Sequence, residues 1–194
     1  MKERIIVALD VDTYEQARRL VDQLEEAVYF KIGLRPFLKF GDRLIDYLKK
    51  MGKRTFLDLK FKDIPNTVYG AVKSSLRYSP DMLTIHLSGG GEMIRKAVEA
   101  AREKEELKIL GVTVLTSLSG DDLRETGVHL TPAEAVMNLC QLGVRNGLFS
   151  FVCSPHEIGI LRKKFGDTIT LVTPGIRPRW AASQDQKRVF TPED

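Results

Sequence analysis

Short apolar runs alternate with amphipathic stretches along the whole chain, and this alternation limits the possible folds more than any other feature. The first run, Ile5–Leu9, is apolar throughout, which is typical of a strand buried on both faces. Similar runs follow at Val28–Leu34, Thr55–Lys60, Met82–Leu87, Ile109–Thr116, Leu148–Ser154 and Ile169–Gly175. Between them we expect helices, a first one ending at Glu26 and others near 36–50, 65–78, 91–104, 132–145 and 156–165. Strands that alternate with helices predict βαβ units and a parallel sheet.

The predicted helices begin at sequences that can satisfy their first backbone N–H groups. Thr131–Glu134 and Ser154–Glu157 each place a hydroxyl at N-cap, proline at N1 and glutamate at N3. Asp12–Glu15 resembles a capping box. His156 is then expected to be a solvent-facing residue of a first turn.

A chain of 194 residues is expected to form one domain, residues 1–194, because domains have roughly 100–200 residues. A parallel sheet either stays open or closes as a (β/α)₈ barrel, which typically needs about 250 residues. The last residues, Thr191–Asp194, repeat the hydroxyl, proline and acidic pattern of the earlier helix starts. For a barrel, the seventh helix and the eighth strand–helix unit would therefore be absent. We expect a natural chain longer by about 40 residues.

Composition and charge argue against several classes of protein. The longest stretch without Asp, Glu, Lys or Arg is Ile109–Gly120, with 12 residues, whereas a membrane span needs about 20. Met1–Arg4 leads directly into a strand, so we expect no signal peptide. The net charge of +4 comes from interspersed residues, which suits a small anionic substrate better than nucleic acid. Cys140 and Cys153 lie in apolar runs without metal-ligand spacing and are expected to be buried, reduced thiols.

Polar residues gather where the predicted strands end. In a parallel barrel all of these ends point toward one mouth. Loops begin at strand ends, which explains one or two polar residues, but not two lysines and two aspartates in apolar strands. Burying a charge is costly unless it is paired, so these residues predict an ion-paired network. The residues concerned are Asp10, Lys31, Asp58, Lys60, His86, Thr116, Ser117 and Arg177.

The sharpest local feature is the segment that begins at Asp58. Asp58 and Lys60 are two residues apart, so they share one face of a strand, and Asp63 follows just past the strand end. Crowding of like charges perturbs pKa values and is typical of functional sites. A purely structural ion-pair network is the alternative.

These residues resemble the orotidine 5′-phosphate decarboxylase family, in its bacterial branch. The signature is Asp58-x-Lys60-x-x-Asp63-Ile64-Pro65-Asn66-Thr67. Sugar-phosphate lyases of the same suprafamily share its core, so the wider match matters more. Matching segments cover essentially the whole chain in order: Ala8–Asp10, Phe30–Gly33, Val114–Ser117, Cys153–Ser154, Thr173–Pro178, Asp185–Arg188 and Thr191–Pro192.

The resemblance implies a (β/α)₈ TIM barrel that converts orotidine 5′-phosphate to uridine 5′-phosphate and CO₂ without metal or cofactor. It also implies a cytoplasmic homodimer with shared active sites, acting in the synthesis of uridine monophosphate and binding neither nucleic acid nor membrane. The catalytic residues would be Lys60, Asp58 and Asp63. The substrate would be bound by Asp10, Lys31, Asp58, Lys60, Asp63, Ile64, Pro65, Thr67, Thr116, Arg177 and Gln186.

The resemblance assigns a role to most of these side chains. Lys60 protonates C6 of the pyrimidine, held by Asp58 and by the Asp63 of a partner subunit. Asp10 and Lys31 suit the ribose hydroxyls, Thr67 reaches the ribose across the dimer interface, and Thr116 reads the pyrimidine. Arg177 binds the phosphate, and Gln186, which belongs to a lid over 178–188, bridges the phosphate and the base. The triple glycine of residues 89–91 is interpreted as a loop and helix start.

Two alternatives remain at this stage. Metal-dependent lyases of the suprafamily place a glutamate where this chain has Lys31, and the lysine argues against them. The chain could also be an inactive fragment or a nucleotide-binding module, because the family's Gly-Arg phosphate ligands follow an eighth strand that this sequence does not contain.

Overall fold

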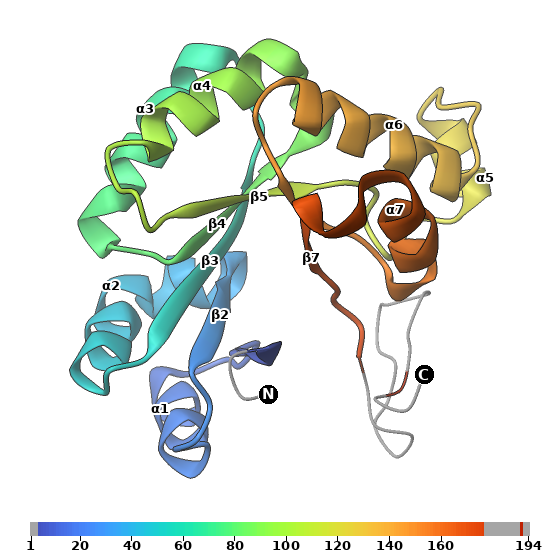
Figure 1. The fold of residues 1–194 in the computed structure, drawn as a ribbon. Coiled ribbons are helices and arrows are strands. Elements are labelled where there is room, and N and C mark those ends of the chain that lie inside the picture. The colour runs from blue at the N-terminus through green and yellow to red at the C-terminus, as the bar shows by residue number, and fades with distance from the viewer. Residues whose placement is uncertain (1–3, 177–190, 192–194) are drawn as a thin grey trace.

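Seven parallel strands form one curled sheet in the computed structural model, which describes residues 4–176 and residue 191 (Figure 1). The strands lie side by side in chain order, so each connection leads from one strand to the strand directly beside it. Their bounds are β1 (Ile6–Ala8), β2 (Tyr29–Gly33), β3 (Arg54–Phe61), β4 (Met82–His86), β5 (Lys108–Val112), β6 (Ser150–Val152) and β7 (Thr170–Val172). This is the architecture of a (β/α)₈ barrel, of which seven strands are present.

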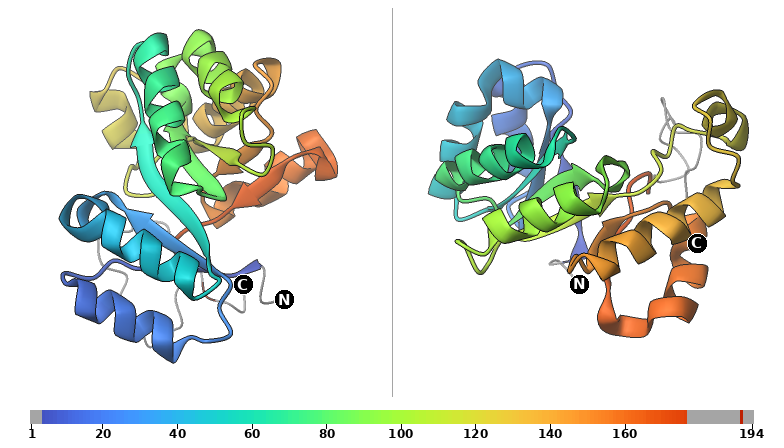
Figure 2. Two further views of the ribbon diagram at one scale, coloured as in Figure 1. Left: turned by 90° about the vertical axis from the view of Figure 1, so that its left-hand side faces the viewer. Right: turned by 90° about the horizontal axis from the view of Figure 1, so that it is seen from above.

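Helices cover the outer side of the curled sheet, with α1 beside α2 and α3 beside α4 (Figures 1 and 2). The α-helices are α1 (Tyr14–Gln23), α2 (Leu34–Lys50), α3 (Pro65–Ser75), α4 (Gly91–Ala101), α5 (Gly120–Glu125), α6 (Pro132–Arg145) and α7 (Ile158–Phe165). Short 3₁₀ turns are η2 (Leu76–Tyr78), η3 (Leu87–Gly89), η4 (Pro155–Glu157) and η5 (Gly166–Thr168). None of the helices among the described residues is long and apolar enough to cross a membrane.

Side chains along each strand point alternately to the two faces of the sheet, and this divides the core into two clusters. Leu57 and Leu83 face outward and are fully buried in the large cluster beneath the helices. Their neighbours Phe56 and Met82 face inward, where they pack with Leu110 in a smaller cluster inside the sheet. Because side chains of a strand alternate between faces, the residues two positions further along also point into the barrel. That step places Asp58 and Thr84 above the inner apolar cluster.

The predicted helix starts are confirmed at α6 and shifted at α1. Thr131 caps α6 in a reciprocal capping box with Glu134. At α1 the cap is Thr13 with Gln16, one residue later than the expected Asp12–Glu15. At Ser154, the hydroxyl accepts a hydrogen bond from the N–H of His156 and begins a 3₁₀ turn, and His156 is exposed as expected.

Several predicted strands and helices end at other residues than expected. The strand expected to reach Thr116 ends at Val112, because the chain turns after β5. The helix expected to reach residue 104 ends at Ala101. The short helix α5 was not predicted, although Ser119 and Asp122 form a capping box at its start. Cys140 and Cys153 are both buried and form no disulfide in the described part of the chain.

Candidate active site

Four charged side chains meet at the carboxyl ends of β1, β2 and β3. Asp10 follows β1, Lys31 lies on β2, and Asp58 and Lys60 lie on β3. The strands are parallel neighbours, so their carboxyl ends share one edge of the sheet. The sequence therefore predicted correctly that these four side chains come together.

The four side chains alternate in charge along a chain of ion pairs. Lys31 Nζ lies 3.7 Å from Asp10 Oδ1 and 3.3 Å from Asp58 Oδ2. On the other side, Lys60 Nζ lies 2.9 Å from Asp58 Oδ1. The Asp58 side chain is only 12% exposed, whereas that of Asp10 is 59% exposed. Asp58 is therefore the buried centre of the network, held between two ammonium groups.

The Asp58 carboxylate is ionised despite its burial. Removal from water opposes ionisation and is the largest single influence on this group. The charges of Lys31 and Lys60, with hydrogen bonds from Lys60 and Thr84, outweigh it and hold the pKa of Asp58 below its usual range. The site thus keeps a fixed negative charge beside two positive ones.

The backbone at Lys60 is unusual. Its φ of 51° lies in the left-handed region, which costs an L-residue roughly 1–2 kcal/mol. The pairing of β3 with β4 shifts at this point, between Leu57 and Phe61. Backbone strain of this kind clusters at functional sites. Nothing in the sequence signals this conformation, since lysine rarely adopts it.

Thr84 on β4 is a site residue that the sequence reasoning missed. Its hydroxyl donates to Asp58 Oδ1 at 3.0 Å and accepts from the Lys60 N–H at 2.9 Å. A signal was present: Thr84 is a polar residue in an otherwise apolar strand, two positions before His86.

His86 at the end of β4 completes this edge of the site. It is partly buried, and burial lowers the pKa of its imidazole, with the charges of Lys60 and Lys62 acting in the same direction against that of Asp58. These influences favour the neutral form of the His86 imidazole. A neutral imidazole beside Lys60 adds no further positive charge.

Comparisons of sequence and of structure with known proteins point to the same family. Residues 3–194 match the family model described as orotidine 5′-phosphate decarboxylase / HUMPS family. The chain is 42% identical to an orotidine 5′-phosphate decarboxylase of Nostoc, over 98% of this chain and 83% of that protein. The chain belongs to the orotidine 5′-phosphate decarboxylase / HUMPS family.

Further relatives within this family agree. An orotidine 5′-phosphate decarboxylase of Staphylococcus aureus is 40% identical, over 100% of this chain and 85% of that protein. The crystal structure of the orotidine 5′-phosphate decarboxylase from Lactobacillus acidophilus superimposes with a TM-score of 0.83 at 37% identity. It covers 90% of this chain and 81% of that one.

The loop after β3 carries the rest of the family signature, away from the ion pairs. Asp63 and Thr67 are exposed, and Ile64 is 69% exposed, while Pro65 begins α3. Asp63 Oδ1 accepts a hydrogen bond from the Ile64 N–H at 2.7 Å. Within residues 4–176, Asp63 forms no ion pair with Lys60. The structure of one chain therefore does not bring Asp63 into the network.

The remaining predicted site residues follow the carboxyl end of β5 or lie outside the described residues. Thr116 is buried in the segment that follows β5. Arg177, Gln186 and the predicted lid over 178–188 lie outside the described residues.

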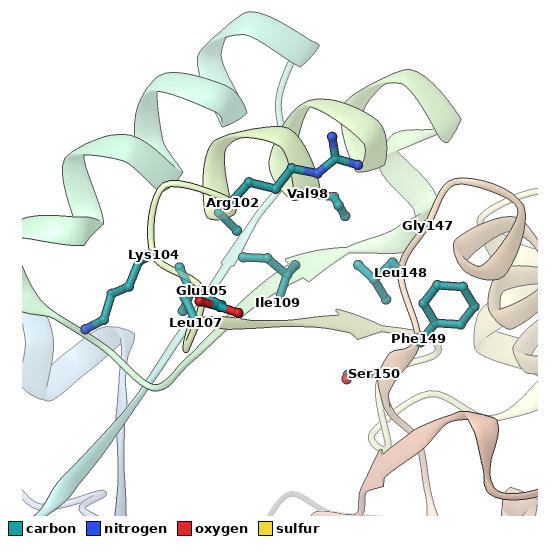
Figure 3. A pocket seen from close by; sticks show the side chains of 11 residues that line it. Val98, Arg102, Lys104, Glu105, Leu107, Ile109, Gly147, Leu148, Phe149 and Ser150 are labelled. Carbon is teal, nitrogen blue, oxygen red and sulfur yellow. The ribbon is translucent and has the colours of Figure 1, made fainter.

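A cavity of about 470 Å³ lies at the other end of the sheet (Figure 3). Its walls come from the end of α4 and from the segments that lead into β5 and β6. Leu107, Ile109 and Leu148 contribute apolar surface, and Phe149 is 49% exposed beside them. Catalytic residues of barrels in this architecture lie at the carboxyl ends of the strands, so this cavity is not the candidate active site.

Among the described residues, no group of three or more His, Cys, Asp and Glu side chains is arranged to hold a metal ion. The two carboxylates of the network, Asp10 and Asp58, have Lys31 Nζ between them.

Proposed function

We propose that this chain, as one domain over residues 1–194, decarboxylates orotidine 5′-phosphate to uridine 5′-phosphate in the cytoplasm. The observation that carries the proposal is the contact of Lys60 Nζ with the buried Asp58 carboxylate, 2.9 Å away, beside Lys31. The relatives named orotidine 5′-phosphate decarboxylase give the substrate. The product belongs to the synthesis of uridine monophosphate.

The chemical problem is the electron pair left on the substrate. When the bond between C6 and the carboxylate breaks, CO₂ departs and the electron pair stays on C6 of the pyrimidine. Lys60 Nζ stabilises this developing charge and then transfers one proton to C6, which becomes a C–H bond. The neutral amine regains its proton from solvent, so atoms and charge balance.

The ion-paired network suits this task because it exists before the substrate binds. Stabilisation by groups that need no reorganisation is usually the largest contribution to catalysis. Asp58 fixes the Lys60 ammonium through their contact and places its own negative charge near the departing carboxylate. Repulsion between those two anions is relieved as CO₂ leaves, which favours the transition state over the bound substrate.

A metal-dependent reaction fits these residues poorly. A divalent cation needs oxygen ligands around it, and the space between the Asp10 and Asp58 carboxylates is taken by Lys31 Nζ. The two ammonium groups, Lys31 and Lys60, already balance the charges of the two carboxylates, and a cation beside them would be repelled. We therefore propose a reaction that uses neither metal nor cofactor.

Other side chains bind the remainder of the substrate. Asp10 and Lys31 suit the ribose hydroxyls, because Asp10, 59% exposed, is the outer end of the network and Lys31 links it to Asp58. Thr116 is assigned to the pyrimidine, and Arg177 and Gln186 to the phosphate. Phosphate contacts far from the reacting carbon lower the barrier through binding energy expressed in the transition state.

We also propose that two copies of the chain share their active sites. Asp63, Ile64 and Thr67 are exposed in one chain, although they follow the catalytic strand directly. A homodimer would cover the exposed Ile64 and deliver Asp63 and Thr67 to the site of the other copy.

Mixed variants test the shared site. Lys60→Ala and Asp63→Ala are each expected to be inactive, and their heterodimers to contain one intact site, with about half of the wild-type turnover. The control is Lys60→Ala mixed with Asp58→Asn. Lys60 and Asp58 of one chain belong to the same site, so each site of this heterodimer carries one of the two changes and no activity should return. Heterodimers without restored turnover would contradict the shared site.

The activity itself is tested by incubating the 194-residue chain with orotidine 5′-phosphate in the presence of a metal chelator. We expect release of CO₂ and formation of uridine 5′-phosphate at an undiminished rate. Binding of uridine 5′-phosphate without any turnover would instead indicate a nucleotide-binding module. Turnover of a sugar phosphate that the chelator abolishes would indicate a metal-dependent lyase.

A further inference from the structure

The hydrogen-bond ladder between β3 and β4 is interrupted at the catalytic lysine. Leu57 pairs with Leu83 and Phe61 pairs with Ile85, so three residues of β3 lie opposite one residue of β4. That one residue is Thr84. An insertion of this kind is a β-bulge, and it leaves backbone groups of the bulged strand without their regular partners.

The side chain of Thr84 takes the place of the missing backbone partner. Its hydroxyl oxygen accepts a hydrogen bond from the Lys60 N–H at 2.9 Å. Lys60 is the residue whose φ of 51° lies in the left-handed region. A conformation that a lysine rarely adopts persists only when its surroundings fix it. The contact from Thr84 is such a constraint, because it ties down the N–H of Lys60.

The same hydroxyl also fixes the partner of the lysine side chain. The Thr84 hydroxyl donates to Asp58 Oδ1 at 3.0 Å, and Asp58 Oδ1 also accepts a hydrogen bond from Lys60 Nζ at 2.9 Å. Thr84 is fully buried, so its single O–H proton has a defined direction between these groups. One hydroxyl therefore holds both ends of Lys60, the N–H directly and the ammonium through Asp58.

We propose that Thr84 is a positioning residue for the decarboxylation, which fixes the left-handed main chain of Lys60 and the orientation of the Asp58 carboxylate together. This inference rests on the proposed function for its effect on turnover. Without the hydroxyl, Lys60 relaxes toward an ordinary strand conformation, and its ammonium no longer points at the reacting carbon. Small displacements of a reacting group cost about 10²-fold in rate.

The kinetic test compares Thr84→Val, which has nearly the same shape without the hydroxyl, with Thr84→Ser, which keeps it. We expect Thr84→Val to lower kcat by about 10- to 100-fold with KM changed less than about threefold, and Thr84→Ser to stay within about threefold of wild type. Thr55→Val is the matched control, since Thr55 is buried at the opposite end of the same strand. Its kcat should not change.

A second readout does not depend on turnover. The Lys60 N–H should be protected from hydrogen exchange in the wild-type chain and in Thr84→Ser, and should exchange faster in Thr84→Val. In Thr84→Val the carboxyl of Asp58 should also titrate at a higher pH, because a hydrogen bond that lowers its pKa is lost. If Thr84→Val does not fold, Thr84→Ala replaces it, and the exchange rate in the wild type still decides.

The outcomes separate this inference from the proposed function. A wild-type chain without turnover would contradict the decarboxylase, while the exchange and titration measurements would still decide the role of Thr84. An active wild type with an equally active Thr84→Val would overturn the inference alone. An unprotected Lys60 N–H in the wild type would overturn it as well.

Discussion

The two ends of the same strands have opposite characters. Toward the amino ends, the inner face of the sheet is filled by Phe56 and Met82, which pack with Leu110 from the middle of β5. Two residues further along β3 and β4, the same face carries Asp58 and Thr84, which are buried in contact with charged groups. One end of the barrel interior is apolar, and the other holds an alternating series of charges.

This difference separates stability from chemistry within a single sheet. The apolar end gains free energy by burial and supports the strands from below. The charged end contains a left-handed lysine and two ammonium groups around one buried carboxylate, an arrangement that costs free energy in a folded protein. Such an end is retained for function, and changes there should affect turnover far more than changes at the apolar end.

Among changes at the groups that surround Lys60, the largest effect is expected from Asp58→Asn. Loss of the carboxylate leaves the ammonium groups of Lys31 and Lys60 facing each other without a shared anion. We expect kcat to fall by about 10²- to 10³-fold, the usual cost of removing one preorganised electrostatic group. Steady-state kinetics measure this, with circular dichroism to verify folding. A variant with more than about a tenth of the wild-type kcat would contradict the central role of Asp58.

At the apolar end, Phe56→Leu should affect stability instead. Phe56 is 3% exposed, and replacing it by a smaller apolar residue costs about 1 kcal/mol of the free energy of unfolding. Urea titration measures this loss, and kcat should stay within about twofold of wild type. A large drop in kcat with unchanged stability would remove the distinction between the two ends.

Acid should reduce the free energy of unfolding through protonation of Asp58. The pKa of Asp58 is lowered in the folded chain, so its contribution to stability is present above the unfolded value of about 3.9 and is lost as pH falls through the folded value. The wild type should therefore lose more free energy of unfolding between about pH 5 and pH 3 than Asp58→Asn does. Parallel pH profiles for the two proteins would show that Asp58 is not stabilised by its partners.

The smallest effect is expected at the cavity beside α4. Phe149→Ala removes an exposed ring from its wall, so we expect less than about 1 kcal/mol of destabilisation and an unchanged kcat. Thermal unfolding and a turnover assay measure both. A changed kcat would mean that the amino end of the sheet communicates with the site.

Sequence periodicity was sufficient to bring together the four charged residues at the strand ends. Asp58 and Lys60 are two residues apart, and parallel neighbours share their carboxyl ends, so their meeting with Lys31 and Asp10 followed from spacing alone. The short apolar runs located all seven strands, although not their ends, because the ends of a strand depend on where the loops turn.

The remaining features depend on contacts that periodicity does not encode. The left-handed φ of Lys60 arises from a bulge between two strands, and the role of the Thr84 hydroxyl is visible only once that bulge is known. The position of Asp63 outside the network was also not predictable from spacing, since the turn after β3 carries it away from Lys60. Whether it reaches a second copy remains a prediction.

Lys60→Ala is the decisive variant for the decarboxylation. The wild-type chain and this variant are incubated with orotidine 5′-phosphate labelled in its carboxyl group, and released CO₂ is counted. We expect turnover by the wild type and a loss of at least about 10⁴-fold in the variant, which lacks both the positive charge and the proton donor. A folded Lys60→Ala with wild-type turnover would mean that Lys60 is not the proton donor.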